Sequence, residues 1–182
     1  ESGNIYFEIP VGQKGDKLLF ETKVKFENSN GGEPPSFAID MYGPTATMNR
    51  VLQNSGNIKY IYTYSLNGVN QYPIATPLEN GVWYEIQLLI DKTTGTYDVQ
   101  FKTDAFKDKT MKVAGKYDKT LGVTLNKGLP LNPAQYQSGV VKARFSLTAR
   151  VGEMYVDYIR FKDNAATLEY KGPPVEKLPL PY

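Results

Sequence analysis

The sequence contains no cysteine and no histidine among its 182 residues. The absence of cysteine excludes disulfides and thiolate metal sites, but it leaves the compartment open because many secreted bacterial proteins fold without disulfides. The absence of histidine further excludes a Ser-His-Asp triad, a Cys-His pair and a zinc site with the usual ligands. Any catalysis is therefore left to carboxylates, Tyr, Lys, Arg or an oxygen-ligated metal.

Long apolar runs and a concentration of one charge are also missing. No run approaches the roughly 20 residues that a membrane helix needs, and no signal-peptide pattern stands at Glu1. The 21 basic and 19 acidic residues are interspersed and give a net charge of +2, whereas nucleic-acid binders carry a basic stripe. We expect neither a membrane nor a nucleic acid as partner. Because "ESGNIYFEIP" leads almost directly into a strand pattern, we expect a module covalently linked to neighbouring domains.

Alternation of apolar and polar residues is what the sequence has in abundance. The polar turn "KTTG" (92–95) separates two alternating runs, which is typical of a hairpin. Period-two alternation predicts strands with one buried face. The clearest runs are 17–27, 82–91, 96–103, 140–150 and 153–163, and weaker candidates are 4–9, 36–42, 46–53, 57–64 and 109–114.

About ten short strands with almost no helical periodicity predict an all-β fold. We expect an antiparallel β-sandwich of the jelly-roll type, with a closed barrel as the alternative. Residues 116–139 are rich in Gly, Pro and Asn and resist assignment to strands. We treat them as a loop, which at this length is usually either functional or a segment with unrecognised strands. Since the alternation stops after Asp163, we expect a β-sandwich module over residues 1–165 and a proline-rich tail or linker over residues 166–182.

Two segments carry a resemblance to a known family. "GVWYEIQLLIDKTTGTYDVQF" followed some fifty residues later by "GEMYVDYIRFKD" resembles the concanavalin A-like (laminin G-like) jelly rolls that serve as carbohydrate-binding modules. The pattern spans roughly residues 4–163 and is similar to carbohydrate-binding module family 66, whose members accompany fructan- and pectin-active enzymes. The resemblance implies a secreted or cell-surface bacterial protein that binds a plant cell-wall or related polysaccharide or oligosaccharide.

Asp157 is a candidate metal ligand. Within "YVDYIRF" it alternates with Ile159 and Phe161, and a carboxylate on an apolar face needs a partner or a cation. The resemblance implies a structural Ca²⁺ held by Asp157 and an early acid such as Glu8. The alternative is a partner such as Arg144, another arginine or a tyrosine hydroxyl, and no D-x-D-x-D-G loop supports the metal.

Catalytic carboxylates do not stand out. Jelly-roll hydrolases of the laminarinase type carry Glu-x-Asp-x-x-Glu along one strand, and no stretch here reproduces it. Glu85 and Asp91 lie on one face, but the strand rise separates them by roughly 20 Å, too far for glycosidase chemistry. A non-catalytic module is therefore expected. A lyase or hydrolase with a histidine-free site and a purely structural sandwich remain the alternatives.

Candidate ligand-binding residues come from outward positions and from the tyrosines, which number 14 against 8 Phe and 1 Trp. In 57–64 the Tyr face is the more apolar and is expected to turn mainly inward, leaving its end near the loop 65–73 for a ligand. Trp83 is expected to cap the edge of the core, with a stacking surface as the alternative. Sugar recognition needs an aromatic face and bidentate polar groups. The residues that fit are Arg50, Tyr64, Tyr72, Glu85, Gln87 and Arg144.

Overall fold

The computed structural model describes residues 2–9, 12–28, 30, 36–44, 48–55, 58–64, 71–75, 79–110, 115–131, 138–148 and 152–165. The side chains of residues 2–5, 36, 48–55, 58–64, 71–75 and 147–148 lie outside this description. The predicted tail, 166–182, and the predicted strand residues 111–114 also lie outside it.

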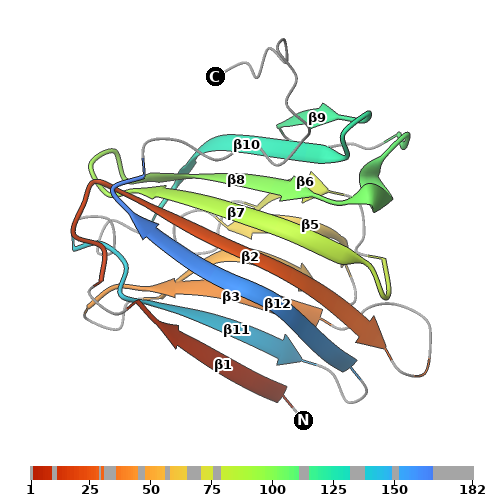
Figure 1. The fold of residues 1–182 in the computed structure, drawn as a ribbon, viewed down its shortest axis with the longest axis horizontal. Coiled ribbons are helices and arrows are strands. Elements are labelled where there is room, and N and C mark those ends of the chain that lie inside the picture. The colour runs from red at the N-terminus through yellow and green to blue at the C-terminus, as the bar shows by residue number, and fades with distance from the viewer. Residues whose placement is uncertain are drawn as a thin grey trace.

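Two six-stranded sheets form the described part of the chain, and every ladder is antiparallel (Figure 1). We call them sheet A and sheet B. Sheet A has the order β1 (Ser2–Glu8), β11 (Lys142–Thr148), β3 (Ser36–Tyr42), β4 (Met48–Ser55), β5 (Ile58–Tyr64) and β6 (Gln71–Ala75). Sheet B has the order β12 (Gly152–Asp163), β2 (Lys17–Asn28), β7 (Trp83–Asp91), β8 (Thr96–Lys102), β10 (Val123–Pro130) and β9 (Lys116–Asp118).

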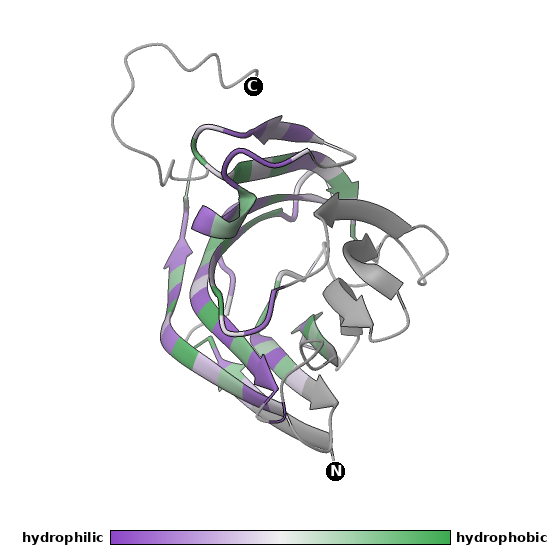
Figure 2. Ribbon diagram, turned by 90° about the vertical axis from the view of Figure 1, so that its right-hand side faces the viewer, coloured by the Kyte–Doolittle hydropathy of each residue, from purple (hydrophilic) through white to green (hydrophobic). Residues whose placement is uncertain are grey.

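The alternation read from the sequence sorts the side chains as predicted. Along β7 and β8, Tyr84, Leu88 and Phe101 are buried in one core cluster, whereas Trp83 and Lys102 point to the other face. Hydrophilic and hydrophobic residues alternate visibly along the strands in Figure 2. Because one face of these strands is predominantly apolar, the two sheets bury those faces against each other. On the other face, Leu19 and Leu89 form a small separate cluster with Ala165. The predicted all-β sandwich is confirmed.

Aromatic contacts join the two sheets across the core. Phe26 of β2 and Phe37 of β3 stack with ring centroids 4.1 Å apart. The ring centroid of Phe145 in β11 lies 5.9 Å from that of Phe20 in β2 and 5.3 Å from that of Phe7 in β1. Rings of this size supply much of the apolar area that holds such a sandwich together.

Two predictions from the sequence are wrong in this part of the fold. The segment predicted as a loop, 116–139, contains β9 and β10, which pair with each other and add two strands to sheet B. Its alternation is hidden by a register shift between Asn126 and Leu129, where Gly128 takes a positive φ of 68°. The predicted loop 65–73 likewise ends in β6, so Tyr72 belongs to a strand. A 3-10 helix, η2 (Asp104–Phe106), follows β8.

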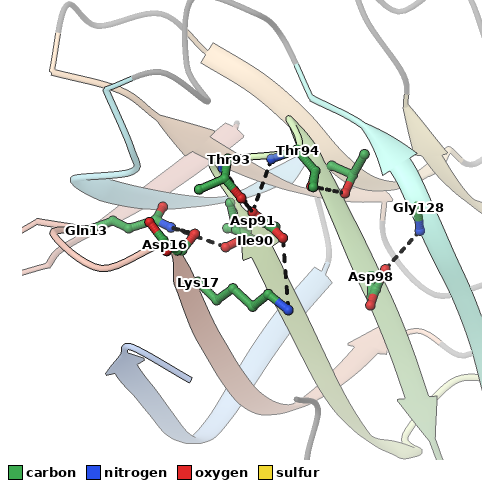
Figure 3. Close-up of polar contacts among 10 residues, drawn as sticks. Gln13, Asp16, Lys17, Ile90, Asp91, Thr93, Thr94, Asp98 and Gly128 are labelled. Carbon is green, nitrogen blue, oxygen red and sulfur yellow. Dashed lines mark hydrogen bonds and ion pairs between the residues drawn. The ribbon is translucent and has the colours of Figure 1, made fainter. Parts of the chain in front are cut away.

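The predicted hairpin between β7 and β8 is confirmed, and Asp91 organises its turn (Figure 3). Its Oδ1 accepts hydrogen bonds from the Thr93 N–H at 2.9 Å, the Thr93 hydroxyl at 2.6 Å and the Thr94 N–H at 3.2 Å. Burial would raise the pKa of Asp91, but these donors outweigh it and lower the pKa below its ordinary value. The turn is therefore stabilised by an ionised carboxylate.

The buried amide of Gln13 fastens the chain before β2 to the same end of the sandwich (Figure 3). Its Nε2 donates to the carbonyls of Asp16 at 3.1 Å and Ile90 at 3.2 Å. Its Oε1 accepts from the Val140 N–H at 3.3 Å. One side chain thus satisfies backbone groups from three segments, which fixes both sheets at this end.

In the described residues, no helix has the length and apolarity to cross a membrane.

Candidate functional site

The six ligand-binding residues predicted from the sequence do not gather at one place. Arg144 lies in β11 of sheet A, whereas Glu85 and Gln87 lie in β7 of sheet B. All three alternate with core residues, so they face outward on opposite sides of the sandwich. The other three residues lie in β4, β5 and β6, where the structure describes the backbone alone, and their roles stay predictions; they are Arg50, Tyr64 and Tyr72.

Arg144 is held on the outward face of sheet A by Asp40. Its Nε and Nη2 donate to the same carboxylate oxygen, Oδ2, at 3.0 and 2.6 Å. Asp40 is fully buried although it points away from the core, with 0% of its surface exposed. A buried carboxylate requires such charge-assisted partners. The pair therefore fixes the guanidinium in place before any ligand arrives.

Two tyrosines and a lysine adjoin this ion pair. The ring centroids of Tyr6 in β1 and Tyr42 in β3 lie 6.2 Å apart. The Nζ atom of Lys142 lies over both rings, 5.3 Å from the centroid of Tyr6 and 5.1 Å from that of Tyr42. The guanidinium of Arg144 also lies over the Tyr42 ring, at 5.5 Å. Tyr6 is 49% exposed, so one ring of the pair is open to solvent.

We call Tyr6, Asp40, Tyr42, Lys142 and Arg144 the sheet A cluster. Backbone register explains why they meet, because Tyr6 pairs with Arg144, Arg144 with Asp40, and Lys142 with Tyr42. Side chains of directly paired residues lie side by side on one face. The cluster therefore spans three adjacent strands, and the next pair along the row joins the backbones of Asp40 and Arg50.

Burial and charge shift two pKa values in the sheet A cluster. Burial raises the pKa of the Tyr42 hydroxyl, with Asp40 and Tyr6 adding to the rise against the opposing effect of Arg144. Burial alone would lower the pKa of Arg144, but the hydrogen bonds to Asp40 and Tyr6 reverse this and raise it. At neutral pH Tyr42 thus offers a protonated hydroxyl and Arg144 a permanent cation, a combination suited to binding oxygen-rich ligands.

Gln87 belongs to a buried polar row on sheet B. Its Nε2 donates to Glu21 Oε2 at 2.8 Å, and its Oε1 accepts from Gln100 Nε2 at 3.0 Å. Gln87 is 1% exposed, and both polar atoms of its amide form hydrogen bonds within this row. Glu85, two residues earlier on the same face, is partly exposed and pairs in register with Lys23 and Lys102.

The prediction that Asp157 lies on an apolar face with Ile159 and Phe161 is wrong. A register shift between Val156 and Tyr158 in the β12–β2 ladder moves Asp157 out of phase with Ile159 and Phe161. Its side chain is 53% exposed and its Oδ2 lies 3.4 Å from Lys23 Nζ.

Glu8, the second predicted metal ligand, is exposed in β1 of the other sheet and pairs in register with Lys142. The described residues contain no group of three or more acidic side chains placed to hold a metal ion. The structural Ca²⁺ stays a prediction that chelation can test.

Sequence reasoning found Arg144 but missed the residues around it. Ala38, Asp40 and Tyr42 alternate with apolar residues in "SFAIDMY", which indicates an outward carboxylate and ring. Tyr6 similarly alternates with Phe7. What the sequence does not show is the pairing of β1 with β11 and of β11 with β3, which brings the side chains together.

Comparisons with known proteins agree with the fold. No protein-family model and no curated protein sequence matches the chain. Lectin I-B4 of Griffonia simplicifolia, in its metal-free form, superposes with a TM-score of 0.50 at 10% identity, covering 90% of this chain and 81% of the lectin.

Two further structures are similar with lower scores. A variant of human galectin-16 gives a TM-score of 0.46 at 14% identity, covering 89% of this chain and 95% of that one. An alginate lyase from Alteromonas sp. 272 gives 0.39 at 11% identity, covering 88% and 79%. At these identities the similarity concerns the fold. The chain has an antiparallel jelly-roll β-sandwich, the fold that it shares with the Griffonia lectin.

Proposed function

We propose that the chain is a non-catalytic carbohydrate-binding module whose binding surface is the sheet A cluster. The observation that carries the proposal is the exposed ring of Tyr6 beside the Lys142 ammonium and the fixed Arg144 guanidinium. A sugar ring stacks on an aromatic face while its hydroxyls accept from the neighbouring cations. A shallow surface of this kind exchanges water for protein contacts at small net gain, so we expect a Kd of about 0.1–1 mM.

Acidic sugars suit this surface better than neutral ones. Among the described residues Lys142 forms no ion pair; it lies over the two tyrosine rings although Glu8 is its neighbour in register. A uronate carboxylate brought next to Lys142 and Arg144 gains charge-assisted hydrogen bonds. We therefore favour pectin over fructan as the ligand class, within a secreted polysaccharide-degrading enzyme.

The test is calorimetric titration of the chain with oligogalacturonate, with a fructan oligosaccharide in parallel. Tyr6→Ala and Lys142→Ala should each weaken oligogalacturonate binding about fivefold to tenfold, and added salt should weaken it further. Lys116→Ala removes an exposed lysine from the edge strand β9 and is the matched control. Equal binding by Tyr6→Ala and the parent chain would refute the site.

The same samples separate binding from catalysis. The chain alone should release neither unsaturated products nor new reducing ends from pectin during the titration. Product release abolished by Tyr6→Ala would replace the binding proposal with an enzymatic one, since tyrosine is among the few catalytic groups that a chain without histidine retains.

A further inference from the structure

A second group of exposed aromatic side chains lies on the outward face of sheet B, on the other side of the sandwich from the sheet A cluster. Trp83, expected to cap the core, begins β7 and is 39% exposed, and Tyr155 of β12 is 40% exposed. With Tyr6, these are the exposed large apolar side chains in the described residues. Exposed rings offer apolar area that a ligand can remove from water.

Backbone register places the two rings in one row with a lysine between them. Tyr155 pairs with Lys25, and Lys25 pairs with Trp83, so all three side chains share a face. The rings are two strand spacings apart, about 10 Å. Lys25 Nζ lies 4.4 Å from the Tyr155 centroid and 5.5 Å from the Trp83 centroid. An ammonium with hydrogen-bond donors is therefore held between two aromatic surfaces.

Among the described strands, none pairs with Tyr155 or Trp83 on its outer side. β12 is the edge strand of sheet B, so Tyr155 has no neighbouring strand beyond it. The β7–β8 ladder ends where Glu85 pairs with Lys102, so no β8 residue pairs with Trp83. The row therefore begins at an edge of the sheet and ends beyond the last pair of a ladder, and an extended ligand can follow it across three strands.

Two lysines and three acids surround the row, and each lysine forms an ion pair. Lys25 Nζ lies 3.5 Å from Glu27 Oε2, and Lys23 Nζ lies 3.4 Å from Asp157 Oδ2. The Tyr155 hydroxyl donates to Glu153. Both lysines form ion pairs, whereas Lys142 of the sheet A cluster forms none among the described residues. A surface whose cations are already paired, with two rings beside them, favours an uncharged, hydroxyl-rich ligand over an anionic one.

We propose that Trp83, Lys25 and Tyr155 form a second binding surface, for a neutral β-linked polysaccharide chain. The ring separation is comparable with the length of two pyranose units, so the rings contact alternate sugars while the Lys25 ammonium donates to a hydroxyl between them. Together with the sheet A cluster, the second surface gives the module two opposed binding faces of different ligand class. The second surface consists of residues that do not belong to the sheet A cluster, so this proposal does not depend on the proposed function.

A protein partner fits this surface less well. Stable interfaces bury about 800 Å² on each side and are depleted of charge at their centres. Here the two rings are separated and leave only a narrow strip of apolar surface. The charged side chains around them are Lys23, Lys25, Glu27, Glu153 and Asp157.

The sole tryptophan makes the test direct. Trp83 is the only Trp in the chain, so its emission reports on this surface. Titration with cellohexaose, a neutral β-linked hexasaccharide, should change the emission saturably. Tyr155→Ala should weaken cellohexaose binding about fivefold, the effect of losing one stacked ring. Lys116→Ala changes an exposed residue of β9 that lies outside both proposed surfaces, and it should leave cellohexaose binding unchanged within twofold. Circular dichroism confirms that each variant is folded.

Several outcomes would overturn the proposal. They are an emission unchanged by cellohexaose, equal affinity of Tyr155→Ala and the parent chain, or equal weakening by Lys116→Ala and Tyr155→Ala. Sedimentation showing a dimer that Tyr155→Ala dissociates would identify the surface as a contact between copies. Calorimetry with oligogalacturonate tests the sheet A cluster, and Trp83 emission with cellohexaose tests the second surface. Failure of one proposal can therefore be distinguished from failure of the other.

Discussion

Replacing Arg144 by Met tests whether the ion pair with Asp40 holds the sheet A cluster together. The substitution keeps most of the aliphatic volume but removes both hydrogen bonds to a carboxylate that is fully buried. Breaking a fully buried pair costs about 3–5 kcal/mol. Because the Arg144 side chain retains 18% exposure, we expect a cost at or just below the lower end of that range, about 2–3 kcal/mol. For a domain of this size the melting temperature should fall by about 4–12 °C.

Urea unfolding followed by circular dichroism measures this loss. Adding Asp40→Asn to the Arg144→Met background removes the charge that is costly to bury, so the double variant should recover about half of the lost stability. Two results would refute the reasoning. One is an Arg144→Met variant within about 0.5 kcal/mol of the parent chain, and the other is a double variant less stable than Arg144→Met alone.

Four further predictions concern the scaffold. Phe145→Ala should cost about 3–5 kcal/mol in urea unfolding, because the ring contacts aromatic side chains from both sheets. Asp91→Ala should cost about 1–2 kcal/mol at pH 7; since the folded-state pKa is lowered, this difference should vanish as the pH falls below about 4 and through the folded-state value. Gln13→Ala should cost about 2 kcal/mol by the same assay, because it leaves buried backbone groups without their hydrogen bonds. EDTA should lower the melting temperature if Asp157 or another group binds Ca²⁺, and an unchanged midpoint would count against the metal.

Sequence patterning predicted the sandwich where strands are regular. Period-two alternation over 82–91 and 96–103 corresponds to β7 and β8, because burial of one face requires that spacing. The prediction failed over 116–139, where Gly128 adopts a positive φ and the register shifts. It failed again at Asp157 for the same physical reason, since one extra residue in a strand exchanges the two faces. Bulges are the feature that alternation alone does not show.

The candidate site was less predictable because its residues come from strands distant in the chain. Tyr6 and Arg144 are neighbours through the pairing of the first strand with the eleventh. Nothing local in "NIYFEIP" indicates which strand lies beside it. Residue type and phase gave Arg144, whereas its neighbours required the sheet order.

Outward polar residues in this sandwich fall into two groups, buried and accessible, which the alternating sequence pattern does not distinguish. Asp40 and Gln87 point away from the core, yet they are 0% and 1% exposed and their polar atoms bond to neighbouring side chains. Tyr6 and Lys142 lie on the same type of face, but Tyr6 is open to solvent and Lys142 lies over rings. A ligand can contact the second group without breaking a buried hydrogen bond, whereas contact with the first group must replace one. Arg144 belongs to both groups, because Asp40 holds its guanidinium while one side of it faces Tyr42. We therefore expect Arg144 substitutions to lower stability and affinity together, and Tyr6 and Lys142 substitutions to lower affinity alone.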